Sequence, residues 1–434
     1  MFLHPPSQEV QQPLLILGET TFRRQHRRFG LLPEDRGRHL YLLGKTGSGK
    51  STLLANLIAQ DLKREDVGLD VLDPHGDLIE AVLPHVPASR TNDVLLFSPE
   101  DTDYPIAFNV FRQGRRPHPN LPLLAGQLVS VFRRQWADSW GPRLEHVLRN
   151  AILAVAPDPR ATLLFLYRYL TDERLRTALA PGIADPVVRQ FWTSEFPRYT
   201  RTLQSEALAP VLNKLGAFVT NPTVRVIVGQ ERSRLDLLGM MERRGILLAN
   251  LAAGRIGESA GHLLGGLLLS ALQLSAMERP RGGPVFITYV DEFQHFVTDS
   301  LATLLSESRK FGLALVLAHQ YLGQLPEALR EAVLGNVGSL IIFRLGAGDA
   351  DVLEPEFAPV FKAGDLQSFE RYHVAVKLLA RGETLAPFSA RTLSALSRPD
   401  RAAERIAAIR AQSRARFASR QGNVEAAIER TFEH

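Results

Sequence analysis

The feature that most constrains this chain is the stretch LLGKTGSGKSTLL, from Leu42 to Leu54. Its segment from Gly44 to Ser51 matches the pattern G-x-x-x-x-G-K-[S/T] in full, directly after an apolar run. Glycines in this pattern let backbone N–H groups close around phosphate oxygens at the positive end of the following helix. The stretch therefore predicts a buried strand, a phosphate-binding loop and a helix that together bind a nucleoside triphosphate.

Two side chains of this loop carry specific roles. Lys50 is expected to reach the β- and γ-phosphates, and the Ser51 hydroxyl is expected to ligate Mg²⁺. A chance match in a glycine-rich turn is the alternative, but eight matching positions between a strand and a helix argue against it. We expect nucleotide contacts from Gly44, Lys45, Thr46, Gly47, Ser48, Gly49, Lys50, Ser51 and Thr52.

Composition narrows the class of protein. A chain of 434 residues is longer than a domain with a single hydrophobic core usually is, so we expect two compact units, one of them inserted into the other. A net charge of +5 favours polyanionic partners only mildly, and the absence of cysteine excludes disulfides and thiolate zinc sites. No signal peptide is visible, and the apolar run from Ser259 to Met277 contains His262 and Gln273, so we predict a buried helix there rather than a membrane span. We expect a cytoplasmic protein.

The order of elements predicts an α/β fold with a mainly parallel sheet. Short apolar runs with little alternation indicate strands covered on both faces, and helical stretches separate them. The runs are HLYLL, VGLDVL, DVLLF and PIAFNVF in the first quarter, and then residues 245–251, 285–293, 312–320 and 339–346. Between these two groups, apolar residues at Leu144, Val147, Leu148 and Ala151 show helical spacing.

We therefore expect a first motor segment at 1–111, an all-α insertion at 112–230 and a second motor segment at 231–393. An arginine-rich helical tail follows at 394–434. A solvated surface helix is one interpretation of that tail, and contact with a neighbouring subunit or nucleic acid is the other.

The strand FITYV ends in Asp291 and Glu292. An acid at the tip of a buried strand beside the phosphate loop can hold Mg²⁺, and a second acid after it can polarise an attacking water. We therefore assign Asp291 to the metal and Glu292 to catalysis. A GTPase switch is a rival because DPHG, residues 73–76, fits D-x-x-G, yet no guanine-reading N-K-x-D sequence is present. Asp73, His75 and Asp77 form either a polar loop at the strand tip near the nucleotide or DNA, or an ordinary turn.

Gln320 ends the strand after these carboxylates and can sense the γ-phosphate. Arg309 precedes the same strand and therefore lies towards the opposite edge of the sheet. From that position it is poorly placed for its own nucleotide but can reach the site of an adjacent subunit, where such arginines are worth ~10³ to 10⁵ in rate. A solvated helix end is the competing interpretation of Arg309.

Together these motifs resemble the HerA/FtsK superfamily of ring-forming DNA pumps, and the soluble body of conjugative coupling proteins and their membrane-free relatives is most similar. The quoted motifs are joined by LRNAIL, PVLNKLGAF, NLAAGRIGE, YVDEFQHF, ESRKFGLALVLAHQYLGQL and NVGSLIIFRLGAGDADVL, which together span most of residues 40–380. The resemblance implies a RecA-like motor that assembles into a hexamer, with ATP and Mg²⁺ at each subunit boundary and DNA in a central channel.

The resemblance also assigns catalytic roles to Lys50, Glu292, Gln320 and the trans-acting Arg309, and makes Arg344 a second candidate for contact across the boundary. Arg255 stands in a loop that either contacts DNA or only connects a strand to a helix. The helical insertion is similar to the domain through which coupling proteins meet cargo, so we expect a membrane-channel or relaxase partner there and recruitment to the inner face of the membrane. Coupling proteins usually begin with membrane-spanning helices, whereas we expect no membrane span in this sequence.

The sequence thus predicts an ATP-dependent DNA translocase of the conjugation type. Whether it acts on single- or double-stranded DNA stays open. A secretion or pilus-assembly ATPase with protein cargo is the alternative, since the insertion could dock proteins. A non-hydrolysing scaffold ring is disfavoured because Glu292 and Gln320 are both present.

Overall fold

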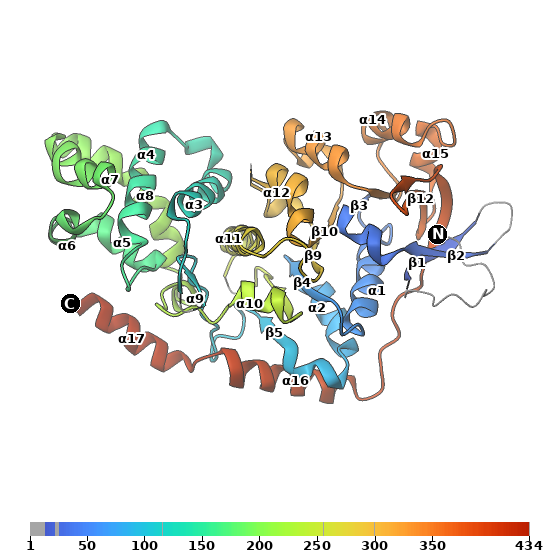
Figure 1. Cartoon of the computed structure of the whole chain (residues 1–434), viewed down its shortest axis with the longest axis horizontal. Helices are drawn as coiled ribbons and strands as arrows, with labels where there is room; N and C mark the ends of the chain where they lie inside the picture. The colour runs from blue at the N-terminus through green and yellow to red at the C-terminus, as the bar shows by residue number, and fades with distance from the viewer. Residues whose placement is uncertain (1–13, 22–25, 115, 255, 299, 434) are drawn as a thin grey trace.

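The computed structural model describes residues 14–21, 26–114, 116–254, 256–298 and 300–433. Within these residues one 11-stranded sheet forms the centre of the molecule (Figure 1). Its spatial order is β2 (Arg28–Leu31), β1 (Leu15–Thr20), β15 (Phe388–Thr392), β12 (His373–Lys377), β11 (Ser339–Ile342), β3 (Leu40–Leu43), β10 (Leu313–His319), β9 (Phe286–Val290), β4 (Gly68–Asp73), β8 (Ile246–Asn250) and β5 (Val94–Phe97).

The strands from β11 to β5 are mutually parallel, which confirms the predicted α/β fold with a mainly parallel sheet. The remaining strands β12, β15, β1 and β2 extend the sheet antiparallel from β11. The prediction of a strand at PIAFNVF was wrong, because those residues form only an isolated bridge between Ile106 and Ala418. Their backbone groups instead bond to distant segments, as Phe108 N–H does with Ile227 O near the end of α9 (Pro222–Val228).

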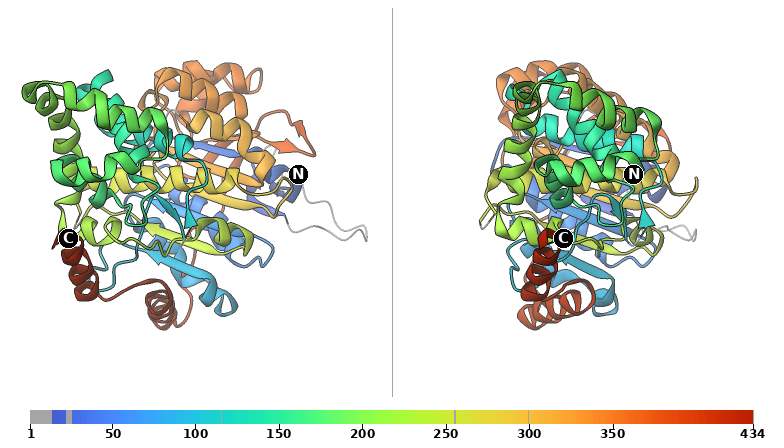
Figure 2. Two further views of the ribbon diagram at one scale, coloured as in Figure 1. Left: turned by 60° about the vertical axis from the view of Figure 1, so that its left-hand side comes forward. Right: turned by 90° about the vertical axis from the view of Figure 1, so that its left-hand side faces the viewer.

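Both faces of the sheet are buried, as the unbroken apolar strands require. On β3, Leu40 and Leu42 join the core beneath α1 (Lys50–Leu62) and α2 (Asp77–Val82), whereas Tyr41 and Leu43 join the core on the opposite face. That second core continues through α11 (Glu258–Met277) and α12 (Leu301–Glu307). Figure 2 shows the sheet enclosed between these helical layers.

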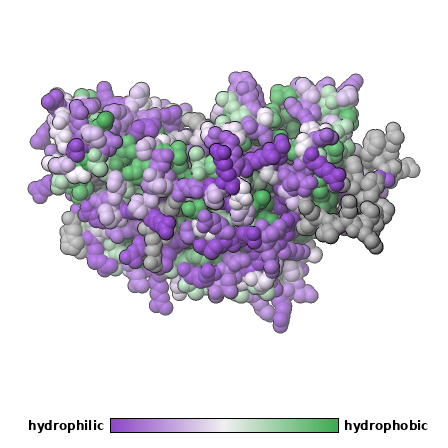
Figure 3. Space-filling view, viewed as in Figure 1, coloured by the Kyte–Doolittle hydropathy of each residue, from purple (hydrophilic) through white to green (hydrophobic). Residues whose placement is uncertain are grey.

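The chain between β5 and β8 builds a helical lobe beside the sheet (Figure 1). In Figure 3 this lobe is separated from the motor by a notch at the upper edge, and hydrophilic residues dominate the visible face. Asp185 caps α7 by accepting from the N–H groups of Val187 and Val188, with Pro186 at the first helical position. The helices of the lobe are α3 (Leu121–Gln135), α4 (Pro142–Val155), α5 (Leu163–Thr171), α6 (Glu173–Leu179), α7 (Pro186–Gln190), α8 (Arg201–Val219) and α9 (Pro222–Val228). The last helix before β8, α10 (Leu237–Glu242), packs against α11 and β4 of the motor.

Helix α11 contains the apolar run from Ser259 to Met277, which is long enough to be considered as a membrane span. Among the described residues it is the one helix long and apolar enough to cross a bilayer, but 78% of its apolar window is buried inside the protein. It packs between the sheet and α3, so the predicted buried helix is confirmed.

The C-terminal tail forms α16 (Ala402–Phe417) and α17 (Gln421–Glu433), which run along the lower side of the molecule from the motor to the helical lobe (Figure 1). Ile409 of α16 is fully buried, and the Ser413 hydroxyl accepts the Leu96 N–H of the edge strand β5 at 2.9 Å. Val424 and Ile428 of α17 are buried at the lobe. The tail therefore has a packed face and is not simply a solvated helix.

Candidate nucleotide-hydrolysis site

The phosphate loop links β3 to α1 through a backbone that only glycines adopt easily. Gly47 and Gly49 have φ angles of 76° and 120°, in the region that side chains disfavour. Gly44 is also packed closely, because a Cβ there would lie 2.5 Å from the Cβ of Phe343. Residues 45–47 are exposed at the surface, and a Cβ on Gly47 would meet no atom within 4 Å. The loop is therefore open to a ligand, although the N–H groups of Lys45 and Ser48 already bond to Arg344 O and Lys45 O.

Lys50 lies at the first position of α1 with only 5% of its surface exposed. Its Nζ donates to Gly44 O at 2.5 Å and to Lys45 O at 3.4 Å, so the side chain curls back under the loop. Burial lowers the pKa of Lys50, while the nearby Glu292 and Asp291 carboxylates act in the opposite direction. An incoming phosphate would replace the carbonyl partners of Lys50 with full negative charge.

Asp291 and Glu292 follow β9 at the same edge of the sheet, and both are nearly buried. Burial, followed by repulsion from Glu292 and Asp73, raises the pKa of Asp291 to about 7. Glu292 adopts a left-handed backbone with φ of 44°, which is uncommon for a residue with a long side chain. Such strain is found at functional sites, where the surrounding contacts hold it.

Gln320 connects these carboxylates to the phosphate loop. Its Nε2 donates to Glu292 Oε1 at 3.0 Å, and its Oε1 accepts from Thr46 Oγ1 at 2.9 Å. The other oxygen of Glu292 accepts from Gln294 Nε2 at 2.8 Å. Gln294 was not predicted, although its position two residues after the catalytic acid was visible in YVDEFQHF. The structure thus brings Thr46, Gln320 and Glu292 into one hydrogen-bonded chain.

The residues present fit a magnesium ion. Ser51 and Asp291 line one cavity of about 520 Å³, and Asp73 lines it as well. Glu292 and Asp73 lie close enough to Asp291 that their charges add to the effect of burial in raising its pKa, and a bound cation would offset that repulsion. The described residues contain no group of three or more His, Asp or Glu side chains that could hold a metal by themselves. Mg²⁺ suits such a site because it takes one or two protein ligands and completes its shell with water and substrate phosphates.

The polar loop after β4 has a structural role. Asp73 accepts from His75 N–H at 2.9 Å and from Ile79 N–H at 3.0 Å, so it closes the turn and supports the start of α2. His75 and Asp77 also line the cavity beside Ser51. The predicted Asx-type turn through Asp73 is confirmed. Contact of His75 and Asp77 with a nucleotide stays a prediction.

The arginines singled out from the sequence lie in different places. Arg309 is exposed and precedes β10, whereas Gln320 directly follows β10. The length of this strand therefore separates Arg309 from the phosphate loop of its own chain. Arg344 is exposed at the tip of β11, where its carbonyl accepts Lys45 N–H at 3.0 Å. It therefore borders its own nucleotide loop. Arg255 lies outside the described residues.

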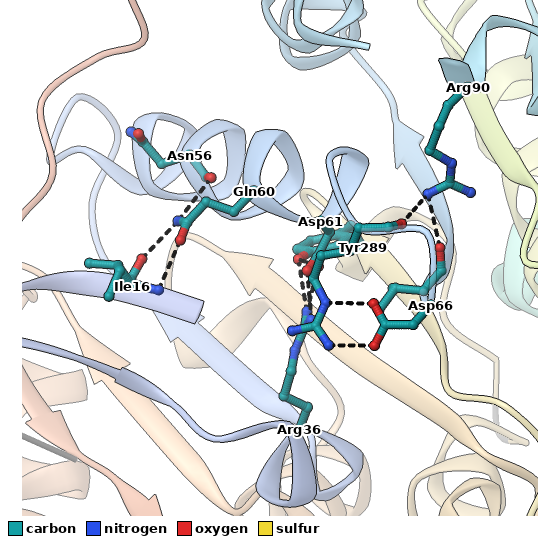
Figure 4. A network of polar contacts seen from close by, with 10 residues as sticks. Ile16, Arg36, Asn56, Gln60, Asp61, Asp66, Arg90 and Tyr289 are labelled. Atoms are coloured by element: carbon teal, nitrogen blue, oxygen red, sulfur yellow. Dashed lines mark hydrogen bonds and ion pairs between the residues drawn. The ribbon is translucent and has the colours of Figure 1, made fainter. Parts of the chain in front are cut away.

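A buried ion pair supports the two elements that carry the site. Arg36, just before β3, donates to both carboxylate oxygens of Asp61 on α1, with one bond of 2.6 Å (Figure 4). Tyr289 on β9 donates its hydroxyl to Asp61 at 2.5 Å. Asp61 and Tyr289 are fully buried. The network ties the helix of the phosphate loop to the strand that presents Asp291.

The fold and this loop–carboxylate–amide arrangement define a RecA-like P-loop NTPase. Residues 31–119 match the family described as helicase HerA, central domain. The predicted resemblance to the HerA/FtsK superfamily is thereby confirmed. No curated protein matches the sequence.

Solved structures share the fold over most of the chain. The plasmid coupling protein TrwB in complex with a non-hydrolysable GTP analogue has a TM-score of 0.64 and 18% identity, covering 86% of this chain and 90% of that one. TrwB with ADP and Mg²⁺ has a TM-score of 0.62 and 17% identity, with 86% and 90% covered. VirB4 of Thermoanaerobacter pseudethanolicus has a TM-score of 0.59 and 14% identity, with 90% and 98% covered.

Proposed function

We propose that this protein is an ATP-dependent DNA translocase that works as a hexameric ring and pumps DNA through a central channel in a conjugation-like transfer. The observation that carries the proposal is the chain from Thr46 through Gln320 to Glu292. It connects the loop that holds the phosphates to the acid that would activate water, as a hydrolysing motor needs. The fold shared with a conjugative coupling protein and the net charge of +5 support DNA as the cargo.

In this proposal the residues of the site divide the reaction between them. The loop N–H groups and Lys50 hold the phosphates and offset their charge. Ser51 and Asp291 would hold Mg²⁺, which when bound draws charge from the phosphate oxygens. Glu292 orients the attacking water and accepts its proton, and Gln320 registers whether a γ-phosphate is present.

The ring arrangement follows from Arg309. This exposed side chain stands at the opposite end of β10 from Gln320, away from its own phosphate loop, so we assign it to the nucleotide of another copy. A site completed by a neighbour makes hydrolysis depend on assembly, and a closed ring gives every site such a neighbour.

The test measures ATP hydrolysis with and without long DNA, for the wild type and for Glu292→Gln. We expect DNA to stimulate the wild type, and Glu292→Gln to lose about 10²-fold or more in rate while still binding ATP. Glu331→Gln, an exposed acid on α13 (Glu327–Asn336), is the matched control and should behave as wild type. Electron microscopy with DNA and a slow ATP analogue should show six copies around a strand. Absence of both DNA stimulation and DNA movement would refute the proposal.

Protein cargo is the second candidate. The helical lobe lies beside the motor, and in this alternative its surface docks the protein cargo. If the ring hydrolyses ATP without DNA stimulation while the lobe captures a secreted protein, the second function replaces the first.

A further inference from the structure

A turn far from the sequence motifs reaches the phosphate loop from its other side. Tyr372, just before β12, donates its N–H to Ser48 O at 2.9 Å, and its own carbonyl accepts Thr392 N–H at 2.9 Å. Cδ1 of the ring lies 2.7 Å from where a Cβ on Gly49 would stand. The backbone of Tyr372 has a φ of 70°, a conformation that tyrosine rarely adopts. The ring is thus held against the loop at some conformational cost.

The order of the strands tells on which side the base of a bound nucleotide lies. β10 and β9, which carry Gln320 and Glu292, lie on one side of β3, and β11 and β12 lie on the other. The γ-phosphate must point to the side of Glu292 for hydrolysis. The ribose and base, at the other end of the molecule, then extend towards β11 and β12. Because β12 runs antiparallel to β11, its first residues lie at the edge where the phosphate loop stands.

Two side chains at that place are suited to a flat aromatic ring. The ring of Tyr372 is half-buried, and the guanidinium carbon of Arg371 lies 4.7 Å from its centroid. Arg371 is exposed, and no hydrogen bond or ion pair of its side chain is found within the described part of the chain. Aromatic rings and arginine planes are the groups on which proteins stack nucleobases.

We propose that Arg371 and Tyr372 form the subsite that stacks the purine base of the nucleotide. This inference rests on the proposed function as a nucleotide hydrolase and adds how the base is held. Stacking contacts the π face, which adenine and guanine share, so the subsite accepts both ATP and GTP. The turn at Tyr372 is bonded to Ser48, so the two stacking side chains hold a fixed position relative to the loop that binds the phosphates.

The competing interpretation is that Tyr372 only packs under Gly49 and supports the loop. Inorganic tripolyphosphate separates the two, because it binds the phosphate loop without offering a base. A stacking residue contributes to ATP and GTP binding alone, whereas a supporting residue contributes equally to all three ligands.

The experiment is calorimetric titration of the full chain, in the presence of Mg²⁺, with ATP, GTP and tripolyphosphate. Tyr372→Ala and Tyr372→Gly should both weaken ATP and GTP binding by ~5-fold to 100-fold and leave tripolyphosphate binding unchanged. Tyr372→Gly serves as the backbone control, because glycine adopts the positive φ without strain. Arg371→Ala should give a smaller loss with the same selectivity. Equal losses for all three ligands, or unchanged ATP binding, would overturn the proposal.

A second measurement covers the case in which tripolyphosphate binds too weakly to titrate. The Tyr372→Trp variant should bind ATP as tightly as the wild type does. Both ATP and GTP should quench the fluorescence of the introduced indole. Absence of quenching at saturating ATP would overturn the proposal. All these readouts are of binding, so they stand apart from translocation. Lys50→Ala, which should lose all three ligands, shows that they report this site; if wild-type protein bound none of them, the proposed function itself would fail.

Discussion

The amide of Gln320 donates to the carboxylate of Glu292 across 3.0 Å, and the same amide accepts from the Thr46 hydroxyl of the phosphate loop. One short side chain thus contacts both the group that would hold the phosphates and the group that would activate water. We expect a phosphate arriving at the loop to compete for Thr46 and Gln320 and so to change the hydrogen bonding of Glu292. Hydrolysis can then depend on whether the loop is filled.

The first prediction concerns Gln320. Gln320→Ala keeps the phosphate loop and the Glu292 side chain but removes the bond that holds Glu292, so ATP should still bind while hydrolysis slows by roughly 10- to 100-fold, the cost of Glu292 shifting by about an ångström. Steady-state ATPase assays with a separate binding titration check this. Gln367→Ala on α15 (Ala363–Ser368) removes an exposed glutamine and should change neither quantity. A large loss of binding in Gln320→Ala would contradict the assigned role.

The second prediction concerns Arg309. Arg309→Ala should bind ATP normally and hydrolyse it at least ~10³-fold more slowly, because the arginine would act on the site of a neighbour. Mixing Arg309→Ala with Lys50→Ala protein should restore part of the activity, since some boundaries then combine an intact loop with an intact arginine. Lys310→Ala, the exposed adjacent cation, is the control. Mixtures no more active than their parents would argue against action between subunits.

The third prediction concerns pH and His39. This buried imidazole accepts Leu315 N–H at Nδ1 and pairs with Leu305 O through Nε2, both at 3.0 Å, so the neutral ring carries its proton on Nε2. Burial is the main cause that lowers the pKa of His39 from 6.5 to about 4. Its contribution to stability is therefore complete above pH 6.5 and is lost as the pH falls through 4, up to about 3 kcal/mol.

Denaturant unfolding between pH 7 and 4 measures this loss. His39→Asn keeps an acceptor for Leu315 and tolerates the φ of 62° found at this position, but it does not titrate. The variant should be less stable at neutral pH and show a shallower decline in acid. A decline as steep as that of the wild type would assign the acid sensitivity to other groups, such as His319, whose pKa burial lowers to about 3.

The fourth prediction concerns the ion pair beneath the site. Arg36→Ala leaves the carboxylate of Asp61 fully buried without its cation, and should cost about 3–5 kcal/mol in the free energy of unfolding. The double variant Arg36→Met with Asp61→Leu removes both charges and should recover a substantial part of that loss. Urea denaturation of the two variants checks the prediction. If the double variant is less stable than Arg36→Ala, charge burial is not the main cost.

The fifth prediction concerns the tail. Ile409→Asp places a charge at a fully buried position of α16 and should detach the tail without unfolding the motor. Trypsin should then cut at the arginines of α16 much sooner than in the wild type. Ala408→Asp, at an exposed position of the same helix, should leave the cleavage rate unchanged. Equal protection of both variants would mean that the tail is held by α17 alone.

The parallel half of the sheet could be predicted because each of its strands is a continuous apolar run between helical stretches. The antiparallel half could not. β12 pairs with β11 and with β15, and β15 pairs in turn with β1. β1 and β15 lie more than 350 residues apart in the sequence, as the pairing of Gly18 with Thr392 shows. Strand pairing over such separations is decided by the whole fold, and short segments with polar ends carry little local signal of it.

The phosphate loop and the paired carboxylates were readable because their chemistry demands contiguous residues. The contact of Gln294 depends on the left-handed backbone of Glu292, and that of Tyr372 depends on a turn over 300 residues from Lys50. Neither feature has a recognisable sequence pattern. The tail was ambiguous for a similar reason. Its arginines suggest a solvated helix, and only the fold shows Ile409 and Ser413 turned towards β5.

The position of α16 along β5 has a consequence for how copies of this protein can meet. An uncovered outer strand offers its amides to any extended peptide, which is how sheets grow from one molecule into the next. Here a serine hydroxyl and a helix occupy that place, so the sheet stops at the boundary of the chain. Any neighbour on this side would therefore contact the chain through side chains of α16 rather than by extending the sheet.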